Sequence, residues 1–549
     1  MGALTLTYLF FGWHRRWICD DGLIVTRTVR QVLAGHGPVF NAGQRVEVNT
    51  STVWTYLLVV AGWVTGKDIA PLAVGCGLIL AVVGLALGMD ASRRLHLRVR
   101  PGATFLPLGA LVVVALPPLW DFATSGLETG LTFGWLGATY WALVRLGQPA
   151  PRWFAALAAV LVGLGPLVRP EMTVVTAAAL PVMWFLRGLG IRRAVRLVGC
   201  AGVLPVAYEL FRMGYYGMIV PQTAIAKEAG NSVWGRGLTY AWDFADPYVL
   251  WIPLLVTIAA VTFHLIHNRR DSVTVVLMAM PLACSVALCL YVIRLGGDFM
   301  HARMLLAPLL LLVLPVLLVP VRPVWAGLTI PVAAWAIVCI VTLRVNYMGI
   351  ALDGIANERM FWVTHTRDPH PVTAAPFEKL LSTLVPDYRA QGSAGFAYIL
   401  HDRVVLLPVR AGVPWRFSAE IPNIGMGGAS LSLDEGDIDS LGLADPLAAH
   451  MQLDHVGRAG HEKELPDAFL LADLTPPDVH LPADAPSSQQ VAAARRALSC
   501  GEVAEMQRAV QGPLTVSRFW TNLIGAIRRT SFRIPDDPQQ AADSFCGPH

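Results

Sequence analysis

The sequence predicts a polytopic α-helical membrane protein that carries a separate water-soluble domain after its last membrane span. Three observations support this fold class. Of the 549 residues, 55% are hydrophobic and only 15% are charged, whereas soluble proteins carry about 25% charged residues. The apolar residues form long runs, and these runs end near residue 343. Residues 1–345 hold 26 Lys and Arg against 14 Asp and Glu, a net charge of +12, whereas the last 204 residues hold 16 against 24, a net charge of −8.

The chain therefore divides into a basic membrane domain, residues 1–345, and an acidic domain, residues 346–549. The overall net charge of +4 hides this division, so it does not indicate a nucleic-acid partner. The sequence contains no P-loop, dinucleotide fingerprint, His/Cys zinc pattern or nucleophile elbow. Their absence argues against a nucleotide-driven pump, and a substrate carried on a membrane lipid would need no nucleotide site.

Apolar runs of sufficient length define the membrane spans, because a helix needs about 20 mostly apolar residues to cross the hydrocarbon core. The candidate cores are Ile69–Leu87, Ala103–Leu119, Leu127–Val144, Trp153–Leu167, Met172–Leu186, Leu197–Leu210, Tyr248–Ile266, Ser272–Ile293, Met304–Val319 and Val324–Leu343. The opening run Ala3–Trp13 is too short to span alone and lacks the basic start and cleavage site of a signal peptide. We interpret it as the outer end of a first span whose start is missing or trimmed.

Basic residues indicate the orientation of the spans, because short loops rich in Lys and Arg stay in the cytoplasm. The basic clusters lie at residues 93–100, 145–152, 187–196, 269–270 and 322. They all fall on one side only if the short apolar run Thr52–Val64 does not cross the membrane. We therefore expect about eleven spans, an N-terminus inside, a first outer loop over residues 14–68 and a C-terminal domain outside.

The first outer loop begins with the adjacent carboxylates Asp20 and Asp21. Adjacent carboxylates repel each other, so they are useful where a cation, a proton or a sugar hydroxyl lies between them. The alternative is a helix-capping Asp followed by a solvated one. Further along the same loop, Asn49 offers an amide suited to a sugar.

Later outer connections add more polar groups. The segment from Trp120 to Gly130 contains Asp121 and Glu128, and it has too many carboxylates and hydroxyls for a plain turn. Arg169 and Glu171 flank Pro170 at the next outer edge. They suit either structural pairing or phosphate binding, and the sequence does not decide between the two.

The last two outer connections contain aromatic and cationic side chains. Tyr215 and Tyr216 suit either a sugar or an interfacial aromatic belt. Lys227 is a candidate phosphate contact in the same long loop. Asp298, His301 and Arg303 follow the glycine pair 296–297 and supply an acid, a ligand and a cation together.

The acidic domain is predicted to mix short helices and strands. We expect helices over 377–385 and 490–498, strands over 404–407, 417–421 and 468–471, and a glycine-rich loop over 425–428. Its only cysteines are Cys500 and Cys546. In an oxidising outer compartment such a pair is expected to form a disulfide, whereas a reducing compartment would leave both thiols free.

Together these motifs resemble the GT-C class of polyprenyl-phosphate-sugar glycosyltransferases, in particular the branch with the terminal β-(1→2)-arabinofuranosyltransferases of mycobacterial and corynebacterial cell walls. The segments that carry the resemblance are Asp20-Asp21-Gly22, residues 125–130, Arg169-Pro170-Glu171, residues 215–223 and residues 296–303. The resemblance implies a GT-C fold in a bacterial plasma membrane, with an active site and a β-rich carbohydrate-binding module on the periplasmic side.

The resemblance also implies the substrates. The donor would be decaprenyl-phosphoryl-β-arabinofuranose, and the acceptor would be the non-reducing ends of arabinan in arabinogalactan and lipoarabinomannan. A divalent cation is expected near Asp20 and Asp21. The sequence does not indicate an oligomeric state.

Residue roles follow from this chemistry as hypotheses. We expect side chains with a fixed positive charge to contact the donor phosphate. We assign the catalytic and substrate-contacting roles to the remaining polar residues of the outer motifs. We assign binding of the donor phosphate to Arg169, Lys227, His301 and Arg303. We assign catalysis to Asp20, Asp21 and Asp298. We assign substrate contacts to Asp121, Glu128, Tyr215, Tyr216 and Asn49. A β donor that gives a β product means retention, so the Asp role stays open between nucleophile, metal ligand and orienting group.

Two other functions compete with the transferase. A lipid-linked sugar transporter or flippase would place charges near the middle of the bilayer, whereas this sequence places them at the outer edge. A non-catalytic envelope assembly protein would need only the outer domain.

Overall fold

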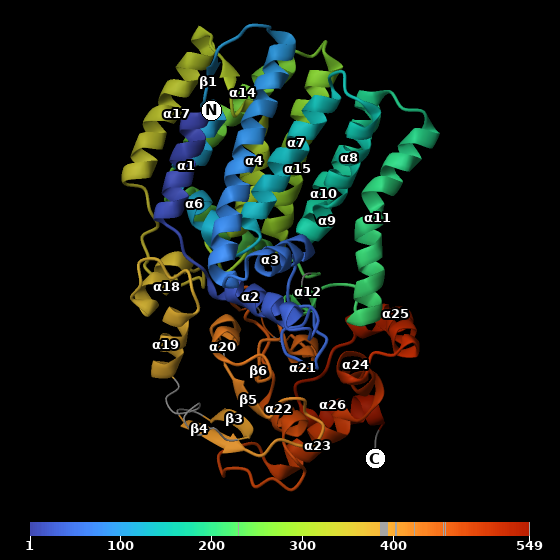
Figure 1. Cartoon of the computed structure of the whole chain (residues 1–549). Helices are drawn as coiled ribbons and strands as arrows, with labels where there is room; N and C mark the ends of the chain where they lie inside the picture. Colours follow the sequence, from blue (N-terminus) through green and yellow to red (C-terminus); the bar gives the residue numbers. More distant parts are fainter. Residues whose placement is uncertain are drawn as a thin grey trace.

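The computed structural model of the chain describes residues 1–228, 230–384, 394–400, 403–421, 423–453, 455 and 457–547. A bundle of long helices forms the first part of the molecule. A smaller domain, built from the last third of the chain, covers one end of this bundle (Figure 1). We call this end the domain-facing end.

The bundle is built mainly from helices that run along its length. They are α1 (Gly2–His14), α4 (Ile69–Val99), α5 (Leu108–Ala115), α6 (Pro117–Thr124), α7 (Thr129–Leu146), α8 (Arg152–Gly163), α9 (Gly165–Val168), α10 (Thr173–Arg187), α11 (Ile191–Tyr215), α14 (Trp251–His267), α15 (Ser272–Leu295), α16 (Leu306–Val313) and α17 (Pro323–Val341). Every expected span overlaps one or more of these helices. Within the described chain, α4, α11, α15 and α17 are long and apolar enough to cross a membrane by themselves.

Proline explains why several expected spans are broken into shorter helices. The ring removes a backbone donor and clashes with the preceding turn, so a helix ends or restarts there. Pro117 separates α5 from α6, and Pro166 follows the break between α8 and α9. The run after Arg303 is divided likewise into the 3₁₀ turn η2 (Arg303–Leu305), α16 and η3 (Leu314–Val316).

The remaining helices of the first part are short. They are α2 (Asp20–Leu33), α3 (Thr52–Thr65), η1 (Pro170–Met172), α12 (Gln222–Ala226) and α13 (Trp234–Ala245). Helix α3 begins where the Ser51 hydroxyl accepts the Trp54 amide and ends at Gly66, whose φ is 63°. Figure 1 shows α3 beside α2 and across the domain-facing end of the bundle, as expected for a segment that does not cross the membrane.

Glycines bring α4 and α7 into close contact. A Cβ added at Gly130 would lie 2.2 Å from the carbonyl oxygen of Gly77, and one added at Gly137 would lie 2.1 Å from that of Gly84. The two backbones therefore touch along several turns, which only glycine permits. This contact holds the first turn of α7, and with it Glu128, against the wall of the bundle.

The C-terminal domain combines one small sheet with many helices. Its helices are α18 (Glu358–Thr366), α19 (Ala375–Leu384), α20 (Ile424–Ser430), α21 (Pro446–His450), α22 (Asp467–Leu474), α23 (Ser488–Leu498), α24 (Gly501–Gln511), α25 (Val516–Ser531) and α26 (Pro538–Cys546). Strands β3 (Gly395–Leu400), β4 (Arg403–Leu407), β5 (Phe417–Glu420) and β6 (Gly436–Ile438) form a sheet in the order β4-β3-β5-β6. In the bundle, β1 (Phe105–Leu106) pairs antiparallel with β2 (Val319–Pro320).

Three expectations about this domain were wrong. The domain is mixed α/β, but it is not β-rich, because helices contain several times as many of its described residues as strands do. Residues 468–471 belong to helix α22 instead of a strand. Ala468 through Leu471 are all buried. A short run that is buried on every side has no alternation of apolar and polar residues, so its hydrophobic periodicity does not distinguish a helix from a strand. Residues 425–428 belong to helix α20 instead of a loop.

Other expectations about this domain were confirmed. Helices α19 and α23 and strands β4 and β5 lie where the sequence placed them, although residue 385 is outside the described chain. Cys500 and Cys546 form a disulfide with their Cα atoms 5.3 Å apart.

A buried arginine joins α2 to the C-terminal domain. Arg27 is fully buried, and its guanidinium donates to the carbonyl oxygen of Phe40 at 2.9 Å. It also donates to four carbonyl oxygens of the C-terminal domain, those of Gly428 (3.0 Å), Leu431 (3.2 Å), Ser432 (3.2 Å) and Glu435 (2.7 Å). Because one side chain donates to carbonyl oxygens from both parts, separating the domain from α2 would leave buried carbonyl oxygens without a hydrogen-bond donor.

We expect Arg27→Met to destabilise the joint between α2 and the C-terminal domain. The carbonyls that lose their donor stay buried, so the free energy of unfolding should fall by roughly 3 kcal/mol. The matched control is Arg403→Met, whose side chain is 60% exposed beside Asp484 and should change stability by less than about 1 kcal/mol. Thermal unfolding in detergent measures both variants, and equal shifts would contradict this role of Arg27.

Candidate functional site

A cavity of about 220 Å³ lies between the domain-facing end of the bundle and the C-terminal domain. Its wall is unusually rich in charged side chains for a site next to apolar helices. The charged and amide groups that line it are Asp21, Asn49, Glu128, Arg169, Glu171, Lys227, Glu228, Arg236, Asp298, Arg303 and Glu462. Residues far apart in sequence therefore meet at one place.

The first turn of α2 sends its two carboxylates in different directions. The carboxylate of Asp20 turns toward the C-terminal domain and accepts the backbone amides of Gly425 at 3.1 Å and Met426 at 2.7 Å. The carboxylate of Asp21 turns into the cavity and lies 3.4 Å from the guanidinium of Arg303. The two carboxylates therefore have different protein partners, although both residues line a second, smaller cavity described below.

Close packing at Gly425 fixes the position of Asp20. A Cβ added at Gly425 would lie 1.9 Å from the backbone carbonyl oxygen of Asp20, so α20 can approach α2 only with glycine at this position. Burial raises the pKa of Asp20, the neighbouring charge of Asp21 acts in the same direction, and the two amide hydrogen bonds oppose them; the resulting pKa is about 7.

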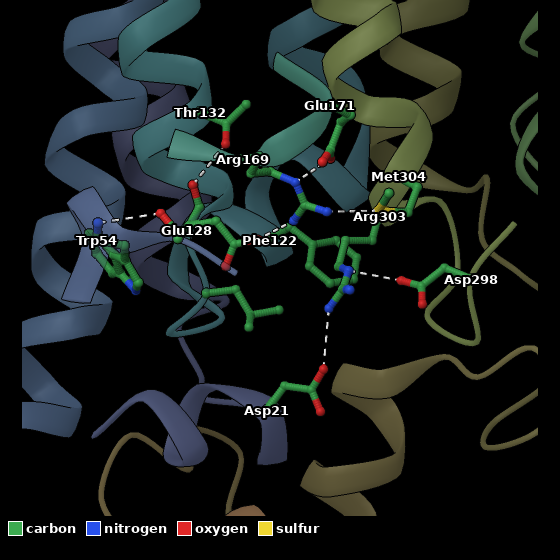
Figure 2. Close-up of polar contacts among 12 residues, drawn as sticks. Asp21, Trp54, Phe122, Glu128, Thr132, Arg169, Glu171, Asp298, Arg303 and Met304 are labelled. Atoms are coloured by element: carbon green, nitrogen blue, oxygen red, sulfur yellow. Dashed lines mark hydrogen bonds and ion pairs between the residues drawn. The ribbon is translucent and has the colours of Figure 1, made fainter. Parts of the chain in front are cut away.

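Two arginines occupy the wall of the bundle next to Asp21 (Figure 2). The guanidinium of Arg303 lies 2.8 Å from Oδ2 of Asp298, but the pair is not oriented as a hydrogen bond. Arg169 pairs with both Glu128 and Glu171 and contacts the sulfur of Met304 at 3.1 Å. Each guanidinium is therefore held by two carboxylates in a partly dehydrated site.

The connection before α7 places Glu128. The Ser125 carbonyl accepts the Cys19 amide at 2.9 Å, and the Gly126 carbonyl accepts the Trp54 indole at 2.9 Å. Gly126 has a φ of 83°, which favours glycine. Residues from α2 and α3 thus hold this turn from both sides.

Lys227 differs from the two arginines. It follows α12, lines the cavity, and its ammonium lies 5.9 Å from the ring of Phe299. Within the described part of the chain, no carboxylate oxygen is within ion-pair distance of this ammonium. Lys227 is thus a positive charge that an incoming anion can bind without displacing a protein carboxylate.

A second, smaller cavity of about 60 Å³ adjoins the first on the side of the C-terminal domain, and it shares Asp21 and Lys227 with it. It is also lined by Glu358, Arg458 and His461. Burial raises the pKa of Glu358 to about 8. Sequence alone did not predict these three residues, because they lie in an acidic domain whose polar side chains form no recognisable motif.

Four of the predicted site residues line neither of these two cavities. Asp121 is held by Arg15 through two contacts of 2.6 and 2.8 Å. His301 lies 2.5 Å from Asp243. Tyr216 donates to the Pro38 carbonyl and packs edge-to-face on Tyr215. These side chains secure loops at the domain-facing end, so the structure does not support their assignment to phosphate or substrate.

One cavity pair was not anticipated from the sequence. Arg236 of α13 lies 2.5 Å from Glu462 of the C-terminal domain and donates to the carbonyls of Gly296 and Gly457. Nothing in the local sequence distinguishes Arg236 from an arginine exposed to solvent. Only the docking of the C-terminal domain reveals its role in closing the cavity.

The residues present do not fit the expected divalent cation. In the described ranges, no group of three or more His, Cys, Asp or Glu side chains is arranged to hold a metal ion. Asp20 is occupied by backbone amides, and Asp21 and Asp298 both face Arg303. The positive charge of this site comes from side chains, and no step below is assigned to a metal.

Fixed cations beside a free carboxylate, at the end of an apolar bundle, suit an enzyme that handles an anionic group at a membrane surface. Comparisons with known proteins identify this enzyme class as the membrane glycosyltransferases. Residues 414–544 match the AftB family C-terminal domain. The chain is 36% identical to the terminal β-(1→2)-arabinofuranosyltransferase of Mycobacterium tuberculosis, over 98% of this chain and 96% of that protein. It is 33% identical to the enzyme of the same name from Corynebacterium glutamicum, over 99% of this chain and 87% of that protein.

The chain therefore belongs to the terminal β-(1→2)-arabinofuranosyltransferase family. Among solved structures, it is similar to ArnT from Cupriavidus metallidurans bound to undecaprenyl phosphate, with a TM-score of 0.43 and 16% identity over 69% of this chain and 70% of that chain.

The raised pKa of Asp20 predicts a pH-dependent effect of Asp20→Asn. Between about pH 4 and pH 7 the folded protein keeps a proton on Asp20 that the unfolded chain releases. The free energy of unfolding of the wild-type protein therefore falls as pH rises through this window. The Asn variant lacks the contribution of Asp20 to this pH dependence. We expect the stability of the wild-type protein relative to the variant to be greatest near pH 4, to fall steadily up to about pH 7 and to change little above that.

Apparent melting temperatures of both proteins across this pH range measure the difference. An advantage that grows with pH would contradict the prediction, because it would mean that the two amide hydrogen bonds outweigh burial and hold the pKa of Asp20 below its usual value.

Proposed function

We propose that this protein transfers β-D-arabinofuranose from decaprenyl-phosphoryl-arabinofuranose to the non-reducing ends of cell-wall arabinan, in arabinogalactan and lipoarabinomannan. The product would be a terminal β-(1→2) linkage. The observation that carries this proposal is that Asp21 shares one cavity with Arg169, Lys227 and Arg303. Family membership supports the choice of sugar and linkage.

The three cations suit the donor phosphate. Arg169 and Arg303 are held in place by carboxylates, whereas Lys227 has no acidic partner within the described chain and has capacity for an anion. Cleavage of the sugar–phosphate bond leaves additional negative charge on the lipid phosphate. Positive groups already fixed at that position stabilise the charge as it develops.

Asp21 suits the sugar side of the reaction. Its carboxylate faces the cavity and lies 3.4 Å from the guanidinium of Arg303. A β donor and a β product require retention. This is achieved either by two displacements through an ester between Asp21 and the anomeric carbon, or by a front-face transfer in which a phosphate oxygen takes the acceptor proton. In the first route Asp21 attacks the anomeric carbon, and in the second it orients the acceptor hydroxyl.

The second cavity is the proposed acceptor position. It reaches Asp21 from the C-terminal domain, and Glu358, Arg458 and His461 offer groups that bind sugar hydroxyls. We propose that the C-terminal domain is the carbohydrate-binding module expected from the resemblance, presenting arabinan ends to Asp21.

We also propose that the protein has a GT-C fold and that its domain-facing end is periplasmic. The basic clusters support this orientation. Arg98, near the end of α4, pairs with Asp271 at the start of α15, and Figure 1 shows these helix ends at the end of the bundle opposite the C-terminal domain. Basic loops stay in the cytoplasm, so the cavity would face the other side.

We expect Asp21→Asn to reduce transfer by a factor of about 100 or more, because the neutral amide neither attacks carbon nor attracts a hydroxyl proton as the carboxylate does. The protein should remain folded, since the Asp21 side chain is 22% exposed and lines a cavity. The matched control is Asp478→Asn, an exposed carboxylate of the C-terminal domain, which should keep full activity.

The measurement is linkage analysis of the product made by purified protein from synthetic arabinofuranosyl lipid and an arabinoside. Full activity of the Asp21 variant, or movement of the lipid without transfer as for a flippase, would overturn the proposal. Formation of a different linkage would overturn only the proposed product.

A further inference from the structure

Helix α25 of the C-terminal domain has two contrasting faces. One face packs on the end of α11: the ring of Phe519 lies where a Cβ of Gly214 would be, at 2.2 Å, and buried Asn522 donates to the Gly214 carbonyl at 3.1 Å. The opposite face exposes four large apolar side chains. They are Val516 (78% exposed), Trp520 (56%), Ile524 (79%) and Ile527 (64%).

The spacing of these four residues puts them on one side of the helix. Steps of four, four and three residues follow the helical repeat, so the side chains form a continuous apolar stripe. A soluble surface rarely presents such a stripe without a partner. We call the four residues the α25 stripe.

The position of α25 indicates what covers the stripe. Helix α11 is long and apolar enough to span a membrane, and only 6% of its apolar window is buried within the protein. Side chains such as Val198, Val203 and Val206 are therefore left for lipid to cover. Figure 1 shows α25 directly at the foot of α11, at the domain-facing end. The α25 stripe thus begins where the lipid-facing surface of α11 ends.

Other short helices at this end have the same character. Helix α13, which packs on the end of α15 through Gly237, exposes Trp234, Leu238 and Trp242. Helix α3 exposes Val60 and Trp63. Tryptophan favours the boundary between headgroups and acyl chains. Helices from both parts of the chain therefore present apolar side chains near the same end of the bundle.

Positive charge exceeds negative charge around the stripe. Arg528 pairs with Glu502 at 2.5 Å, whereas Arg508, Arg518 and Arg529 share Glu505 at 3.2, 3.1 and 3.4 Å. Burial of the stripe requires an apolar partner, and the excess positive charge adds attraction where that partner carries anionic headgroups. A lipid surface meets this requirement, whether or not its headgroups are charged.

We propose that α25 lies in the membrane interface, with its stripe inserted among the headgroups and upper acyl chains next to α11. It is an additional attachment of the C-terminal domain to the membrane, far along the chain from the last span. It holds the domain over the cavity from the side of α11, while Arg27 and Asp20 hold it from the side of α2. The inference does not depend on the proposed reaction.

The test places an environment-sensitive fluorophore on Ile524→Cys in the full-length protein, reconstituted in phosphatidylcholine nanodiscs. Arg403→Cys, at an exposed position of β4 in the same domain, is the matched control. The parent protein, treated with the same reagent, measures background labelling of its native cysteines. Ile527→Cys repeats the measurement one turn along the stripe.

We expect blue-shifted emission from position 524 and its loss when the lipids carry a spin label near the headgroup, with neither effect at position 403. Emission like that of a probe in water would overturn the proposal. A blue shift without quenching by the labelled lipids would also overturn it, because it would mean that another protein surface, such as a second copy of this chain, covers the stripe.

Discussion

The carboxylate of Asp20 binds the first backbone amides of α20, and the geometry of the site depends on this contact. Both carboxylate oxygens accept hydrogen bonds from Gly425 and Met426, so the start of α2 is clamped to the C-terminal domain. Asp21, the next residue, is then directed into the cavity toward Arg303. A motif that lies in a membrane-domain loop thus acquires its orientation from a helix about 400 residues later in the chain. The cavity is complete only when both parts are docked.

The charges of the cavity are arranged to be rigid before substrate binds. Arg169 is shared by two glutamates and Arg303 by two aspartates, and such pairs keep dehydrated cations in place. Lys227 lacks an acidic partner within the described chain, which leaves one cation free for an anion. Side chains therefore provide both the positive charge and its orientation, the two properties needed to stabilise a leaving phosphate.

Sequence alone located much of the bundle and part of the site. Asp21, Glu128, Arg169, Asp298 and Arg303 were predicted together because the order of apolar runs places their connections at one end, and they do meet there. The same logic failed for Asp121 and His301, whose loops are at that end but whose side chains pair with Arg15 and Asp243. Topology assigns a loop to an end of the bundle; it does not say which way a side chain points.

Contacts that depend on docking were beyond sequence reasoning. The turn of Asp20 toward α20, the Arg236–Glu462 pair and the position of Glu358 all arise between segments that carry no matching local signal. The glycine-rich segment 425–428 was expected to be a loop because glycine weakens an isolated helix. In the fold, those glycines are what allows α20 to touch α2 and Arg27.

The measurement that tests this dependence most directly compares transfer by Gly425→Ala and Gly199→Ala. A methyl group at position 425 would lie 1.9 Å from the Asp20 carbonyl oxygen, whereas one at position 199 meets nothing within 4 Å. In Gly425→Ala, displacement of α2 by about 1 Å should lower kcat/KM by roughly 100-fold, while the melting temperature of the bundle stays unchanged. Gly199→Ala should match the wild-type protein in both measurements. Wild-type kcat/KM in Gly425→Ala would contradict the claim that the C-terminal domain positions Asp21.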